Sequence, residues 1–435
     1  MINSSKWVLV IYFTISNNKV ITKILYAKPS TFVTIIGSIV ASEGMRMVQE
    51  VLIELVKGIG RFFLHPAVYI TLIFSILIGY VRVKRERRQF RTRLLWGWTE
   101  TKRFLLDGIV WALIISVISL VVGLVIPHSW LLIYSVWMIL FVLLFTYQFG
   151  SAVYTIALGA ATVYAMFIFN WSFDVFSWNV SGMNILQEGI VPIAIIAGLL
   201  LIVEGVLIQK YAASQASPKL VTTARGMEAI VYKVKRLWLL PILLVIPGDA
   251  ISTYVPYWPQ FPLGESAFSL VLFPFVIGFQ QKSQHSLPIH FFTGYGKIVW
   301  QLGIVITIIA ALGYFEPLVS VIALLVGVVA RLLITIIKYQ QEKTGNFAVS
   351  PQVSGVMIAG VLSDSPAEKM GLLIGERIAK VNGQKVSNEQ EFYEAVQINA
   401  AHCRLEVLDS SGELRLRQHI LFRHDHYRLG LILVR

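Results

Sequence analysis

The histidines are the first residues to test for catalytic chemistry. A helix that holds a hydrolytic zinc ion needs two His and a Glu on one face, as in the pattern HExxH. The pattern is absent from the sequence, because His65 is followed by Pro66 and His128 by Ser129. Leu106-Asp107-Gly108 is similar to the second zinc-ligand motif of intramembrane metalloproteases, but alone it cannot hold a metal.

Other catalytic classes also lack their motifs. The sequence contains neither the Gly-x-Ser-x-Gly of serine hydrolases nor a phosphate-binding glycine loop or a dinucleotide fingerprint. The single cysteine, Cys403, excludes an intrachain disulfide and a cysteine-based metal cluster. We therefore expect no enzymatic activity and no cofactor. A membrane protease that has lost its catalytic motif stays open as an alternative.

Two acidic residues inside apolar segments could serve transport, because ionisable groups within a membrane are usually functional. Glu204 lies about one and a half turns before Lys210, so it could simply reach the membrane interface. Asp249, next to Pro247-Gly248, is the better candidate for a broken-helix site. The two halves of the chain show no matching pair of broken segments. A transporter or channel with a regulatory C-terminal domain is thus the second alternative.

A basic cluster follows the first long apolar segment. Such a cluster can bind anionic lipid headgroups at roughly 1 kcal/mol per cation. It can equally act only as a topological signal that holds this end of the segment inside the cell. Its members are Arg82, Lys84, Arg85, Arg87 and Arg88.

Composition indicates a polytopic membrane protein. The chain is 56% hydrophobic and only 14% charged, whereas ordinary soluble domains carry roughly 25% charge. The net charge of +13 lies before Phe347, because the sequence after it balances acids and bases. An excess of positive charge that is confined to the apolar part indicates membrane topology and contact with anionic lipid, and does not indicate binding of nucleic acid.

Apolar runs long enough to cross a bilayer recur along residues 47–340. The Leu237–Val255 and Leu263–Phe279 pair is the weakest, because Pro241, Pro247 and Pro256 interrupt its first member. We predict nine spans: Phe62–Val81, Leu105–Ile126, Trp130–Tyr147, Ser151–Asn170, Ile190–Gln209, Leu237–Val255, Leu263–Phe279, Ile298–Phe315 and Pro317–Lys338.

The loops predict the orientation. Arg82–Phe104 and Lys210–Arg236 are rich in Lys and Arg, whereas Trp171–Gly189 contains neither. Since basic loops stay in the cytoplasm, nine spans place both basic loops and the C-terminal residues there. Residues 1–46 are only weakly apolar. We interpret them as an upstream extension before a start at Met47 (or Met45), or as one extra weak span.

After a linker over residues 341–354, residues 355–435 have the pattern of a small α+β domain. Ser365-Pro366-Ala367-Glu368 has the form of a helix-capping box, and Asn382-Gly383 predicts a tight type I′ hairpin. Glu389–Asn399 is expected to be a helix, capped by Ser387 or Asn388. Strands are expected at Val356–Leu362, Ile378–Val381, Arg404–Leu408, Leu414–Leu421 and Leu429–Val434.

This order of elements resembles a bacterial PDZ domain, most specifically over Ser365–Gly371 and Gly375–Gly383. PDZ domains bind an extended peptide as an added strand, with a Gly-containing loop at its carboxylate. The matching Leu-Gly-apolar triplet is missing just before Gly355 and is found instead at the far end of the domain. We therefore predict a permuted PDZ domain; alternatively, the last strand merely completes the sheet. The predicted carboxylate loop and pairing strand comprise Arg428, Leu429, Gly430, Leu431, Ile432 and Leu433. The predicted helical wall of the groove comprises Glu389, Phe392, Tyr393 and Val396.

The segment Val51–Arg93 resembles the start of the MinJ family of cell-division topological determinants. The resemblance rests on Gly-x-x-Arg-Phe-Phe-Leu-His-Pro before the first span and on Tyr80–Arg87 after it. It implies a scaffold, enriched at cell poles and division septa, that bridges the polar protein DivIVA to the ATPase MinD and other division proteins. The residues themselves indicate less: a polytopic α-helical membrane domain followed by a small α+β domain that binds peptides.

Overall fold

The computed structural model describes residues 8–16, 19–27, 56, 58–175, 178–223, 226–247, 261–263, 266–351, 354–399, 402–409, 411–420 and 429–434. The chain divides into two compact units. The smaller contains the antiparallel hairpin of β1 (Val8–Ser16) and β2 (Lys19–Ala27). The larger contains residues 61–247 and 271–435.

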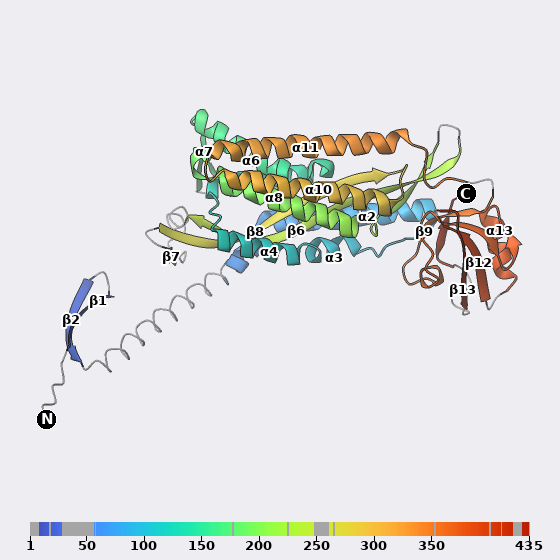
Figure 1. Cartoon of the computed structure of the whole chain (residues 1–435), viewed down its shortest axis with the longest axis horizontal. Helices are drawn as coiled ribbons and strands as arrows, with labels where there is room; N and C mark the ends of the chain where they lie inside the picture. The colour runs from blue at the N-terminus through green and yellow to red at the C-terminus, as the bar shows by residue number, and fades with distance from the viewer. Residues whose placement is uncertain are drawn as a thin grey trace, which may run out of the picture. The chain divides into compact units, whose positions relative to one another are not determined.

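Helices dominate the first part of the larger unit (Figure 1). Five helical segments are long and apolar enough to cross a membrane: Pro66–Phe90, Thr99–Val122, Ile190–Ala212, Pro288–Leu312 and Pro317–Thr344. The helices are α2 (Pro66–Phe90), α3 (Thr99–Leu106), α4 (Ile109–Val122), α5 (His128–Leu143), α6 (Ala152–Ile168), α7 (Ile185–Glu188), α8 (Ile190–Leu207), α10 (Pro288–Leu312) and α11 (Pro317–Thr344), with short turns η1 (Tyr147–Phe149) and η2 (Ile208–Ala212).

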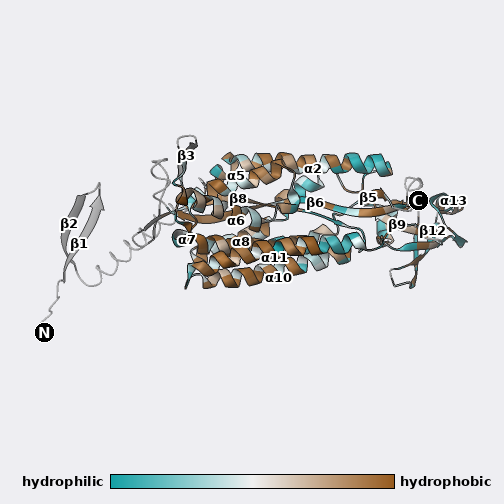
Figure 2. Cartoon of the chain, turned by 90° about the horizontal axis from the view of Figure 1, so that it is seen from above, coloured by the Kyte–Doolittle hydropathy of each residue, from teal (hydrophilic) through white to brown (hydrophobic). Residues whose placement is uncertain are grey.

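Seven of the nine predicted spans correspond to these helices. The segments α5 and α6 are apolar but shorter than the other five. The largest shift in a boundary is that α10 begins at Pro288, ten residues before the predicted Ile298. Figure 2 shows α11 changing from hydrophobic to hydrophilic towards its C-terminal end, as expected where a helix leaves the apolar layer.

The prediction of helical spans at Leu237–Val255 and Leu263–Phe279 is wrong where the structure describes these residues. They lie mainly in two long strands, β6 (Glu228–Pro247) and β8 (Ser266–Ser283). Pro241 sits inside β6, where it would have interrupted a helix. β6 is buried or half-buried along its whole length, and from Leu237 to Pro247 its sequence is almost continuously apolar. This part of the strand therefore has the hydropathy of a span.

These strands belong to a four-stranded sheet with the order β5-β6-β8-β7, where β5 is Ser217–Thr222 and β7 is Phe261–Leu263. A separate hairpin, β3 (Ser172–Val175) with β4 (Trp178–Ser181), follows α6. Asp249, the transport candidate, lies outside the described residues.

Glycines allow α8 and α10 to approach closely. A Cβ on Gly205 of α8 would lie 2.2 Å from the backbone nitrogen of Trp300, and one on Gly296 of α10 would lie 2.5 Å from that of Gln209. Only residues without side chains fit such backbone contacts, a common device where membrane helices pack. The pair therefore forms a tightly packed centre of the helical part.

The C-terminal domain is a sheet with the strand order β13-β12-β10-β9-β14, on which helix α13 (Glu389–Gln397) packs. The short helix α12 (Pro366–Lys369) follows the first strand. The strands are β9 (Val356–Val361), β10 (Arg377–Val381), β11 (Gln384–Lys385), β12 (His402–Leu408), β13 (Leu414–Ile420) and β14 (Leu431–Leu433).

Local signals in this domain act as the sequence predicts. Ser365 caps α12 by accepting a hydrogen bond from the Glu368 backbone N–H at 3.3 Å, and Asn388, not Ser387, caps α13. Asn382 and Gly383 both have positive φ, 50° and 86°, as a type I′ hairpin requires. The chain-terminal strand β14 pairs antiparallel with β9, which places the last strand of the sequence beside the first strand of the domain.

Candidate functional site

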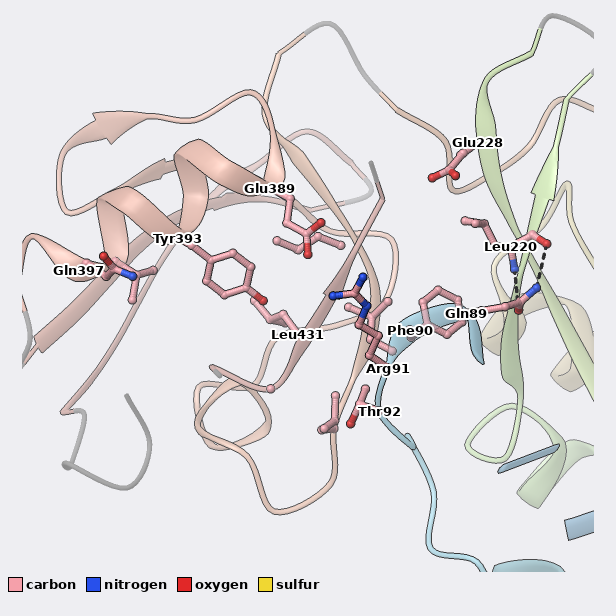
Figure 3. A pocket seen from close by; sticks show the side chains of 15 residues that line it. Gln89, Phe90, Arg91, Thr92, Leu220, Glu228, Glu389, Tyr393, Gln397 and Leu431 are labelled. Carbon is pink, nitrogen blue, oxygen red and sulfur yellow. Dashed lines mark hydrogen bonds between the residues drawn. The ribbon is translucent and has the colours of Figure 1, made fainter. Parts of the chain in front are cut away.

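A groove of about 410 Å³ separates the edge strand β14 from helix α13 (Figure 3). The side chain of Tyr393 points from the helix towards Leu431 on the strand. From the C-terminal domain the groove is lined by Leu362, Glu389, Tyr393, Val396, Gln397, Gly430, Leu431, Ile432 and Leu433.

The structure brings most of the predicted groove residues together. Glu389, Tyr393 and Val396 line the helical wall, and Gly430–Leu433 line the strand wall. Phe392 is fully buried in the hydrophobic core instead, because it lies on the face of α13 that packs on the sheet. Leu429 is likewise a core residue, and Arg428 lies outside the described residues. Their role as a peptide site stays a prediction.

Gly430 forms the turn that leads into β14. Its φ of +86° belongs to the left-handed region, and a Cβ here would lie 2.1 Å from the Cβ of Ser365. The carbonyl of Gly430 accepts from the Leu362 N–H at 2.8 Å, and that of Leu429 from the Ala367 N–H at 3.0 Å. Both conformation and space therefore require glycine, and the turn is fastened to the segment that ends in α12.

The outer edge of β14 is open among the described residues, since β14 is the last strand of the sheet order. The Gly430 carbonyl accepts from the Leu362 N–H, and the Val434 N–H donates to the Met357 carbonyl. Both groups therefore point towards the neighbouring strand β9 and the residue that follows it. Backbone groups alternate direction along a strand, so those of Leu431 and Leu433 point away from β9. An extended peptide could pair with these groups while its side chains contact α13.

The end of α2 also lines this groove, which the sequence did not suggest. Gln89, Phe90, Arg91 and Thr92 reach it from the helical part. Gln89 is held by two hydrogen bonds to Leu220 of β5, donating to its carbonyl at 3.4 Å and accepting from its N–H at 3.2 Å (Figure 3). The positive charge of Arg91 thus lies beside the candidate peptide site. Roughly 300 positions separate it from α13 in the sequence, and no periodic pattern relates elements so far apart.

The basic cluster divides into exposed and internal members. Lys84, Arg87 and Arg88 are exposed, as lipid contact requires. Arg82 does not fit the lipid-binding alternative, because it is only 6% exposed and its guanidinium donates to Glu86 at 2.8 Å and to Glu100 at 2.5 Å and 3.1 Å. Its charge is neutralised inside the protein, so Arg82 is a structural residue and does not face a headgroup.

Glu204 has a structural partner that the sequence did not suggest. Its carboxylate Oε1 accepts from Nε and an NH group of Arg331 in α11, at 3.1 Å and 2.6 Å. Arg331 also donates to the Tyr295 hydroxyl at 2.7 Å, and Ser151 donates to the other carboxylate oxygen. Glu204 and Arg331 are both essentially buried. This ion pair joins α8 to α10, α11 and the start of α6, and it accounts for an acid inside an apolar helix.

Three or more potential metal ligands do not gather anywhere in the described part of the chain. The predicted lack of a metal or cofactor is not tested by this finding.

Comparison with known proteins agrees with both resemblances. Residues 357–408 match the PDZ domain family. The cell division topological determinant MinJ of Bacillus subtilis (strain 168) is 30% identical over 383 residues, which cover 88% of this chain and 96% of that protein. The probable cell division topological determinant MinJ of Lacticaseibacillus paracasei is 24% identical over 396 residues, covering 87% of this chain and 96% of that protein.

Proposed function

The chain belongs to the MinJ family of cell division topological determinants, and from this premise we propose that it is a non-catalytic membrane scaffold for division proteins. Its PDZ domain would capture an extended segment of a partner as a further strand on β14. Five membrane-capable helices support a multi-pass membrane protein. The observation that carries the proposal is the open edge of β14 facing α13 across a groove.

The partners in this proposal are the DivIVA-like polar protein and the MinD-like ATPase that the family resemblance implies. The PDZ domain would lie in the cytoplasm, and the protein would be enriched at poles and septa. Confinement to a membrane raises the local concentration of a partner, so weak contacts in the groove would suffice for recruitment.

Replacing a groove side chain at the edge of the hydrophobic core tests this proposal. Tyr393 is half-buried and lines the groove. We expect Tyr393→Ala to reduce recruitment of the partners to septa at least about fivefold, which corresponds to about 1 kcal/mol of lost contact. Fluorescence microscopy of labelled partners measures the recruitment. Glu394→Ala is the matched control, because Glu394 lies on the same helix and is exposed outside the groove.

A photo-reactive residue at Gln397 tests the groove directly. Gln397 is exposed and lines the groove, whereas Gln390 is exposed and does not. In living cells we expect a partner to crosslink from position 397 and not from position 390. Equal capture from both positions would contradict the proposal, as would undiminished recruitment by a chain that ends at Lys338.

A further inference from the structure

A cavity separate from the peptide groove lies between the C-terminal half of α2 and strand β6. It has a volume of about 150 Å³. One side is apolar, with Leu77, Ile78 and Val81 of α2 and with Phe145. The remaining lining is polar or charged and consists of Arg82, Arg85, Glu100, Gln215, Ser217, Lys233, Lys235 and Arg236.

Cations outnumber acids around this cavity. Five cationic side chains line it, and one carboxylate, that of Glu100, faces them. Glu86 lies next to the cavity but is already bonded to Arg82, Ser217 and the Leu94 N–H. Asp107 pairs with Arg103 at 3.2 Å. A net positive charge therefore remains after every acid that contacts the lining has been counted.

Several buried polar groups in the lining have no hydrogen-bond partner among the described residues. Gln215 is 4% exposed, and both atoms of its amide lack one. Arg236 is 2% exposed; both its terminal nitrogens lack one, and its nearest carboxylate oxygen, on Glu100, is 3.5 Å away. The Nε of Arg85 is a further unused donor. Buried donors without acceptors are rare in folded proteins, so these groups require a partner such as a water, an ion or a ligand.

We propose that this cavity is a binding site for a phosphate group, in the form of an anionic phosphodiester or of free phosphate. Phosphate offers several acceptor oxygens and negative charge, which match the unused N–H groups of Arg85, Gln215 and Arg236. Figure 2 shows α2 changing from hydrophobic to hydrophilic along its length, and the α2 residues that line the cavity, from Leu77 to Arg85, include both kinds. A lipid could therefore place its phosphate on Arg85 and Arg236 and its acyl chains along Leu77 and Val81.

The site differs from the exposed basic cluster on the same helix. Lys84, Arg87 and Arg88 project to the surface and do not line the cavity. An exposed cluster attracts any anionic membrane by diffuse charge, whereas a cavity with unpaired donors holds one group in a defined position. The two kinds of binding can therefore be separated by substitution.

Unfolding temperatures of the full chain, purified in detergent and stripped of lipid, test the proposal. The chain is titrated with phosphatidylglycerol, phosphatidylcholine or sodium phosphate. We expect phosphatidylglycerol or phosphate to raise the unfolding temperature. The Arg85→Gln/Arg236→Gln variant should require at least tenfold more ligand for the same rise. The control Arg87→Gln/Arg88→Gln removes the same charge from the exposed cluster and should respond as the parent chain does.

A second variant avoids the loss of charge. Gln215→Leu removes two unpartnered polar atoms, so the unliganded chain should remain folded while the response to ligand weakens. A response to sodium phosphate as strong as that to phosphatidylglycerol would assign the site to free phosphate, and a response to phosphatidylglycerol alone would assign it to lipid. The proposal is overturned if neither ligand raises the unfolding temperature, or if the cavity variants and the Arg87/Arg88 control respond alike.

Discussion

At the scale of single residues, most of the chain's unusual positions are explained by what lies against them. Gly430 has a positive φ, and the side chain of Ser365 occupies the space that a Cβ at position 430 would need. Arg82 belongs to a basic cluster in the sequence, yet its charge is neutralised by the buried carboxylates of Glu86 and Glu100. The sequence showed the residue types in each case, but only the neighbours determine what each residue does.

Gly430 and Gly412 form a matched pair for substitution. Both have positive φ, 86° and 84°, but Gly412 has nothing within 4 Å of its missing Cβ. We expect Gly412→Ala to cost about 1 kcal/mol of backbone strain, and Gly430→Ala to cost about 2–4 kcal/mol because overpacking against Ser365 is added. Hydrogen exchange of peptides from Val356–Leu408 in the full chain measures the difference. Equal protection in the two variants would show that the Ser365 contact does not constrain the turn.

The thiol of Cys403 should be inert in the folded protein. It is fully buried in the PDZ core, and this burial raises its pKa from 9.0 to about 12. At pH 8 the thiolate fraction is then about a thousandfold below that of the unfolded chain, and only the thiolate reacts. We expect a maleimide to modify the native chain at least a hundredfold more slowly than the chain in denaturant. Comparable rates would mean that the strand β12 is not packed in the core.

At the scale of elements, the C-terminal domain was predictable and part of the helical region was not. Caps and turns such as Ser365 and Asn382-Gly383 are local signals, and they place each strand and helix of the domain. From Leu237 in β6 and along most of β8 the sequence is apolar without alternation, and the described side chains there are nearly all buried or half-buried. Length and hydropathy alone cannot separate such strands from membrane helices. The end of α2 in the groove is a contact between distant segments, which no local pattern encodes.

The buried pair of Glu204 and Arg331 makes a testable link between helices. Replacing one member leaves the other as an uncompensated charge, so we expect Glu204→Gln to destabilise the chain by about 3–5 kcal/mol. The double variant Glu204→Met/Arg331→Met removes both charges with side chains of suitable size and should recover most of this loss. Unfolding of the detergent-solubilised chain by temperature measures both. If the single variant is as stable as the parent, the pair does not hold α8 to α11.

At the scale of the whole molecule, replacing the two predicted spans by strands leaves the predicted topology intact. Nine spans and seven spans are both odd numbers, so the PDZ domain is still predicted to lie on the side of the basic loops. The segment Lys210–Arg236 precedes β8 and α10, and it carries six Lys and Arg residues. Since basic segments stay in the cytoplasm, the ends of α8 and α10 that flank the four-stranded sheet should both face it.

Cysteine accessibility measures this topology residue by residue. In a Cys403→Ser background, single cysteines replace Arg88 near the end of α2, Ser181 at the end of β4 and Gln390 in the PDZ domain; all three positions are exposed. We expect a membrane-impermeant maleimide to label the Ser181→Cys chain in intact cells, because its loop lacks Lys and Arg. The Arg88→Cys and Gln390→Cys chains should react only after lysis.

Labelling of Gln390→Cys in intact cells would put the groove outside, where it could not meet cytoplasmic division proteins. Opposite results for Arg88→Cys and Gln390→Cys would instead require an odd number of crossings between α2 and the PDZ domain. Either one of β6 and β8 alone would then cross the membrane, or only one of the shorter helices α5 and α6 would.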